Sequence, residues 1–249
     1  MSNDLIIRIK NFEPDEAIKL NMPLNVFVQE ADDVFVWCKD DREVLTQVGL
    51  DWASVELIPE CTRFCREFQS QWQKKLKTTS KLKKDWDNTA SEARNLHADL
   101  LHDYGFAFRK DAQLLVKLKE MSSVSSQAKL VQALNDMAAL ANGQSQLLDV
   151  IHFNYANVER AKELVPLLAE LIARMESYKK QKDEIKEMRD KSYAFLKAII
   201  DELKETAKYC FRKNPERLAG YLSDYWARKN VQRVTINNIT TNPDTTAKE

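Results

Sequence analysis

The chain has 249 residues, and its 38 basic and 38 acidic side chains leave no formal net charge. A neutral chain has no overall field that would draw it to nucleic acid or to an anionic membrane, so such binding would need a local patch. With four glycines and six prolines, the composition is typical of long helices and argues against a turn-rich all-β domain.

The sequence predicts a cytoplasmic protein that is neither secreted nor membrane-spanning. No basic segment followed by an apolar stretch opens the chain, and no apolar run reaches the roughly eighteen residues of a membrane helix. The cysteines are too few for a secreted disulfide scaffold. We therefore expect four reduced thiols, at Cys38, Cys61, Cys65 and Cys210.

Apolar spacing predicts two helices in the first part of the chain. Residues 23–48 form a helix that caps the rest, and Asp51 is a candidate N-cap for a second helix over residues 52–103. At 1.5 Å per residue, this second helix would be about 75 Å long. Three glycines end a helical pattern and are interpreted as C-terminal caps: Gly49, Gly105 and Gly143.

Two more helices are predicted between Gly105 and residue 177. The third helix should be irregular at the serine-rich run 122–126, because serine side chains compete for backbone hydrogen bonds. The fourth helix covers residues 145–177, and Pro166 is expected to kink it.

The predicted number of long helices depends on whether the polar segment 178–191 is a loop or a helix. It fits either a loop or an exposed helical extension, and we favour a loop with Asp183 as the next N-cap. A fifth helix then ends at Cys210, and Asn214-Pro215 begins a short terminal helix. The expected fold is all-α: an elongated antiparallel up-and-down four-helix bundle with an extra N-terminal helix and a short C-terminal helix.

Both ends of the chain are rich in β-branched residues, at 5–9 and 234–239. They are interpreted either as a small two-stranded ribbon or as frayed termini. We expect one domain over residues 1–230 and a flexible tail over 231–249. The domain has a cap segment, a long-helix core and a terminal helix, at residues 1–50, 51–213 and 214–230.

A lysine-rich block on the second helix is a candidate partner surface. Four of its lysines fall within a sector of about 80° on a helical wheel, and the nearby tryptophans point to the opposite side. Because bases would have no aromatic platform to stack on, nucleic acid is disfavoured, and a solvated helix face is the alternative. We name these lysines the basic stripe: Lys74, Lys77, Lys81 and Lys84.

The cysteines and histidines are not spaced for a metal site. Cys61 and Cys65 share a helix face, but two further ligands are missing nearby, so core packing is favoured. His97 and His102 diverge by about 140° on a helix, and a di-iron bundle would need two Glu-x-x-His motifs that the sequence lacks. Glycine-rich phosphate loops and nucleophile elbows are also absent. We predict no catalytic, cofactor-binding or metal-binding residue.

Aromatic residues near the C-terminus form a second candidate partner surface, at Tyr221, Tyr225 and Trp226. In one interpretation they dock the terminal helix onto the bundle. In the other they are exposed and form a binding hot spot, where tyrosine and tryptophan are common.

Several segments resemble a group of uncharacterised bacterial helical proteins. The likeness is carried by Arg189-Asp190-Lys191-Ser192-Tyr193, by Arg217-Leu218-Ala219-Gly220-Tyr221 and by Tyr225-Trp226, and it extends to residues 50–52 and 97–110. The resemblance implies a helical fold and a bacterial source, and it carries over no catalytic residue.

The sequence therefore predicts a non-enzymatic interaction or scaffolding protein that needs no cofactor and binds a protein partner, a second copy of itself included. One alternative is a membrane-active protein of the soluble pore-forming type. Its candidate apolar elements, residues 34–37 and 166–168, are too short to span a bilayer. The other alternative is a metal-dependent helical-bundle enzyme.

Overall fold

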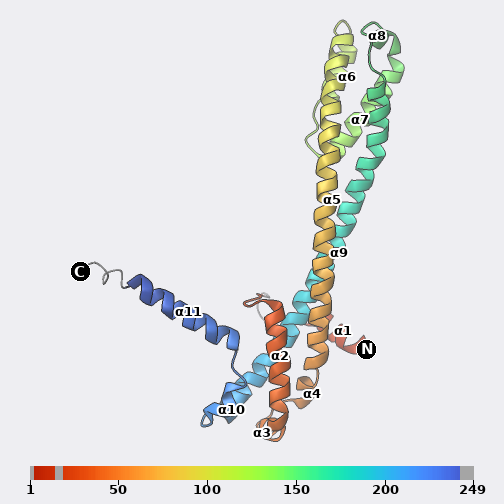
Figure 1. Cartoon of the computed structure of the whole chain (residues 1–249). Helices are drawn as coiled ribbons and strands as arrows, with labels where there is room; N and C mark the ends of the chain where they lie inside the picture. Colours follow the sequence, from red (N-terminus) through yellow and green to blue (C-terminus); the bar gives the residue numbers. More distant parts are fainter. Residues whose placement is uncertain (1–2, 15–18, 242–249) are drawn as a thin grey trace, which may run out of the picture. The chain divides into compact units, whose positions relative to one another are not determined.

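The computed structural model describes residues 3–14 and 19–241, with side chains up to residue 232, and every regular element in it is a helix (Figure 1). The all-α prediction is thus confirmed. In chain order the elements are α1 (Asn3–Asn11), α2 (Leu24–Cys38), the 3₁₀ turn η1 (Lys39–Asp41), α3 (Arg42–Gln47), α4 (Trp52–Val55), α5 (Ile58–Ala107), α6 (Ala112–Met121), α7 (Gln127–Gly143), α8 (Ser145–Asp149), α9 (Ala156–Cys210), α10 (Pro215–Ala219) and α11 (Asp224–Thr241).

The predicted terminal ribbon is wrong, because both of its segments are helical. Residues 5–9 lie in α1, where Leu5 and Ile9 are one turn apart and both buried. Residues 234–239 lie in α11, which also takes in residues 231–241 of the expected tail. The remainder of that tail, 242–249, lies outside the described residues. In α1, the burial of Leu5 and Ile9 on one face overrides the weak strand preference of β-branched residues.

Local cap chemistry is where the predictions agree best with the structure. The Asp51 side chain accepts a hydrogen bond from the backbone N–H of Ala53 at 3.0 Å, as an N-cap should. Gly49 has a φ of 100°, which a side chain would disfavour. The serine-rich run separates α6 from α7, and Ser126 caps α7. Gly105, by contrast, lies inside α5 and is not a cap.

The loop predicted at residues 178–191 is wrong, because this segment is the middle of α9. Asp183 is therefore inside a helix rather than at its start. Glutamate and lysine have high helix propensity, and pairs one turn apart add support. One such pair joins Lys186 Nζ to Asp190 Oδ2 at 2.9 Å, and another joins Lys191 Nζ to Glu187 Oε1 at 3.2 Å.

The chain divides into two compact units. Unit 1 contains residues 1–73 and 184–249, so it is built from both ends of the chain. Its core combines α1 and α2 with the beginning of α5 and the end of α9. Large buried members of this core include Leu5, Phe27, Leu45, Phe64, Tyr193, Leu196 and Tyr221.

Unit 2 contains residues 74–183, in which α6, α7 and α8 lie against α5 and α9 (Figure 1). The two long helices run antiparallel in this unit, since Arg160 Nε donates to Glu92 Oε1 at 2.6 Å and Lys75 Nζ donates to Gln181 Oε1 at 2.6 Å. Inside the core, the Tyr104 hydroxyl donates to the backbone carbonyl of Met137 at 3.1 Å. The single domain over residues 1–230 stays a prediction.

Candidate functional site

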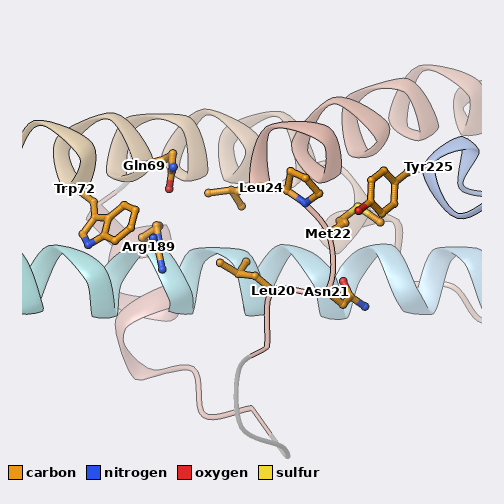
Figure 2. Close-up of a pocket in the computed structure, with 9 residues that line it drawn as sticks. Leu20, Asn21, Met22, Leu24, Gln69, Trp72, Arg189 and Tyr225 are labelled. Atoms are coloured by element: carbon orange, nitrogen blue, oxygen red, sulfur yellow. The ribbon is translucent and has the colours of Figure 1, made fainter. Parts of the chain in front are cut away.

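A cavity of about 540 Å³ opens on the surface of unit 1. Its lining comes from the segment that enters α2, from α5, from α9 and from the beginning of α11. Figure 2 shows Trp72 and Arg189 close together at one end and Tyr225 beside Met22 at the other. The complete lining is Leu20, Asn21, Met22, Pro23, Leu24, Gln69, Trp72, Arg189 and Tyr225.

Arg189 supplies the positive charge at one end of this pocket. Its side chain is only 7% exposed, and its guanidinium carbon lies 4.1 Å from the centre of the Trp72 ring, a cation–π contact. Nε and Nη2 both donate to Asp190 Oδ1, at 2.8 and 2.5 Å. Asp190 therefore holds the guanidinium by one edge, and Trp72 covers one of its faces.

The other walls of the pocket are fixed by hydrogen bonds to the core and to α2. The hydroxyl of buried Tyr193 donates to Asn21 Oδ1 at 3.1 Å, which anchors the segment before α2. Glu30 Oε1 accepts from the Tyr225 backbone N–H at 3.0 Å and from the Ser223 hydroxyl at 2.9 Å. Glu30 thus positions the beginning of α11 and, with it, the Tyr225 ring.

Tyr221 is not part of any exposed aromatic surface, which corrects one of the predicted partner residues. It is 1% exposed and precedes α11, and its hydroxyl donates to Asp41 Oδ2 at 2.5 Å. The docking interpretation holds for this residue. Burial and the hydrogen bond to a carboxylate also raise the pKa of the Tyr221 hydroxyl. Tyr225 and Trp226 are half-buried, and their rings meet edge to face at 5.2 Å.

The basic stripe lies fully on the surface of unit 2, and all four of its lysines are exposed. Trp86 is buried in the core of that unit, and Trp72 is half-buried in unit 1. The prediction that the tryptophans turn away from the lysines is therefore confirmed.

The cysteines and histidines are dispersed. Cys61 and Cys65 are fully buried in the core of unit 1, as their place on the apolar stripe predicted. His97 is buried in unit 2, with Nε2 2.9 Å from the backbone carbonyl of Met121, whereas His102 and His152 are exposed. Among the described residues, no three side chains of the metal-binding types come together.

Burial should protect three of the four thiols from modification. Burial raises the pKa of Cys38 to about 11 and of Cys61 to about 12, and it also raises the pKa of Cys65. Burial raises the pKa of the Cys210 thiol as well, but Cys210 is partly exposed whereas the other three are buried. We therefore expect Cys210 to be the one thiol that reacts with a disulfide reagent at about pH 8 before unfolding. Replacement C210S should abolish this fast reaction, and a fast reaction that persists in C210S would contradict the assignment.

Sequence reasoning found Tyr225 but missed the other pocket residues. The available signal was Arg189, a charged residue that follows the partly buried Met188 and precedes the buried Ser192 by one turn of α9. Its importance becomes visible only when Trp72, more than a hundred positions away in the sequence, is placed beside it.

Comparison with known proteins finds no matching family profile, curated protein or solved structure. The resemblance to bacterial helical proteins therefore stays a prediction. Within the described residues, every helix is too short or too polar to cross a membrane.

Proposed function

We propose that the chain is a protein-interaction module whose unit 1 pocket receives an apolar side chain of a partner polypeptide. The observation that carries this proposal is the composition of the pocket. Trp72 and Arg189 line one end of it and Tyr225 lines the other, beside Met22 (Figure 2). Tryptophan, tyrosine and arginine are the residue types that dominate the energy of protein interfaces, above all when they surround a concavity.

The polar groups of the pocket suit a peptide backbone. The Gln69 side chain makes no hydrogen bond to any described residue, and the bonds of Arg189 use Nε and Nη2, which leaves Nη1 available. Both groups can donate to backbone carbonyls on either side of an inserted side chain. The volume, about 540 Å³, accommodates one or two large side chains.

Two further features belong to this proposal. We propose a four-helix packing for unit 2, where α5, α6, α7 and α9 contribute to one core. We also propose a cytoplasmic location, which the four unpaired cysteines support.

The proposal is tested by selecting peptides from a display library on the full-length protein and measuring their affinity by calorimetry. Leu20, which is 40% exposed at the pocket, is replaced in L20E, and the matched control is L76E in unit 2, where Leu76 is 38% exposed. A buried charge at the pocket should weaken binding at least tenfold, or about 1.4 kcal/mol. The control should bind as the unaltered protein does.

Equal binding by the L20E variant, in a protein whose circular dichroism is unchanged, would show that the pocket is not the docking site. A different outcome would be that no peptide is selected and that the unaltered protein retains a small molecule which L20E does not. The pocket would then be a small-molecule site rather than a protein-docking site.

A further inference from the structure

A segment of α5 in unit 2 carries a run of lysines that no acidic residue interrupts. Residues 74–84 include six lysines and no acidic residue, in a chain whose 38 basic and 38 acidic side chains balance only when this segment is included. The basic stripe occupies one face of this segment. At about 1.5 Å per residue, its successive lysines are about 4.5 to 6 Å apart along the helix axis.

The lysines of the stripe have no acidic partners, unlike many other lysines of the chain. Lys162 pairs with Glu159, Lys186 with Asp190, Lys197 with Asp201 and Lys208 with Glu205. No ion pair within the described residues includes a member of the stripe. Like charges three and four residues apart destabilise a helix by about 0.2–0.5 kcal/mol per pair, so the stripe costs stability.

The side of α5 that contacts α9 is not the side that carries the stripe. Because residues 178–191 are helical, α9 runs antiparallel beside α5 in unit 2. The contact is made by Lys75, whose Nζ donates to Gln181 and lies 4.7 Å from the centre of the Tyr178 ring. By helical spacing, Lys75 is at least about 100° around α5 from every lysine of the stripe, so the stripe faces away from α9 and stays open to a partner.

The chemistry of the stripe favours one class of partner. By helical spacing, the residues that continue this face include Ser70, Asp85 and Asn88, so beyond the lysines it offers polar groups and one carboxylate but no apolar or aromatic anchor. A protein interface normally has such an anchor. Binding to a membrane surface is strong when a broad basic patch also has apolar side chains that insert into the lipid. A straight row of cations matches a linear polymer of phosphates.

The missing aromatic platform disfavours single strands, whose bases need a surface to stack on, but a duplex keeps its bases stacked inside. We propose that the basic stripe binds the phosphate backbone of double-stranded nucleic acid without reading its base sequence. Lysine provides point charges rather than the bidentate contacts with which arginine recognises guanine. The zero net charge of the chain removes long-range attraction, so binding depends on these local contacts and weakens steeply with salt. The stripe belongs to unit 2 and the pocket to unit 1, and this proposal does not depend on the function proposed for the pocket.

The test is fluorescence anisotropy with labelled duplexes of about 20 base pairs in two unrelated sequences, titrated across salt concentrations. The quadruple variant K74Q/K77Q/K81Q/K84Q removes the stripe. The matched control K162Q/K186Q/K197Q/K208Q removes the same charge from lysines that have acidic partners.

The unaltered protein should bind both duplexes equally, with a slope of log affinity against log salt between about −3 and −4, as four phosphate contacts imply. The stripe variant should lose at least tenfold in affinity and most of the slope, and the control should keep both. Equal binding by the stripe variant would overturn the proposal. Tighter, stripe-dependent binding to polyglutamate or to phosphatidylserine vesicles would also overturn it, by assigning the surface to an acidic protein or a membrane.

Discussion

Replacing Asp41 with alanine should lower the free energy of unfolding by about 3 kcal/mol. The Asp41 carboxylate is nearly buried and accepts from Arg217 Nε at 2.9 and 2.7 Å and from the Tyr221 hydroxyl at 2.5 Å. Its removal leaves the Arg217 guanidinium with only the Trp37 carbonyl and the exposed Asp40 carboxylate nearby, and breaking a buried ion pair typically costs about 3–5 kcal/mol. Arg217 is 22% exposed, which places the effect at the lower end.

Asp40 provides a matched control for that experiment. It is the neighbouring carboxylate, its side chain is 84% exposed, and it lies 3.7 Å from Arg217 Nη2. Because exposed ion pairs contribute little, D40A should stay within about 1 kcal/mol of the unaltered protein in urea denaturation followed by circular dichroism. Similar midpoints for D41A and D40A would show that the buried pair does not stabilise unit 1.

Adding a single methyl group at Gly220 should destabilise the protein by about 2 kcal/mol, as overpacking typically does. A Cβ atom at this position would lie 2.1 Å from Cε2 of Trp37. The indole cannot move aside freely, since its Nε1 donates to the Arg217 carbonyl at 3.1 Å and the Arg217 guanidinium carbon lies 4.4 Å from its ring centre. The measurement is the urea midpoint of G220A.

Gly143, the last residue of α7, is the control for this substitution, because nothing lies within 4 Å of a Cβ built there. The G143A variant should be neutral or stabilised by up to about 1 kcal/mol, since alanine restricts the unfolded chain. If G220A and G143A had the same urea midpoint, the Trp37 ring would have to move aside with little loss of stability.

Sequence reasoning succeeded where one residue determines a local structure. Asn214 accepts from the Arg217 backbone N–H at 3.1 Å and is followed by Pro215, as the helix-start pattern predicted. It failed at residues 178–191, where the missing apolar stripe predicts a loop but the segment is the middle of α9. A polar helix segment needs little burial when its neighbours on both sides are anchored in cores and its own charges pair.

At the candidate sites too, local sequence patterns predict local features but not contacts between distant segments. Spacing placed the basic stripe on one exposed face, because α5 is a regular helix there. Spacing could not decide whether Tyr221 faces solvent or the core, since that depends on Asp41, which lies 180 positions earlier in the chain. The pocket is lined by residues from four separate segments, so no local sequence pattern predicts it.

The assembly of unit 1 from both ends of the chain has a consequence for biosynthesis. Its first half, residues 1–73, emerges from the ribosome long before the core partners Tyr193 and Leu196 exist. Unit 2 is a continuous insertion, so its core can close as soon as residue 183 is free. Domains generally fold as they emerge, and unfinished cores expose apolar surface. The part of the N-terminal segment that packs against Tyr193 and Leu196 therefore stays uncovered until those residues are made, which is after the whole of unit 2.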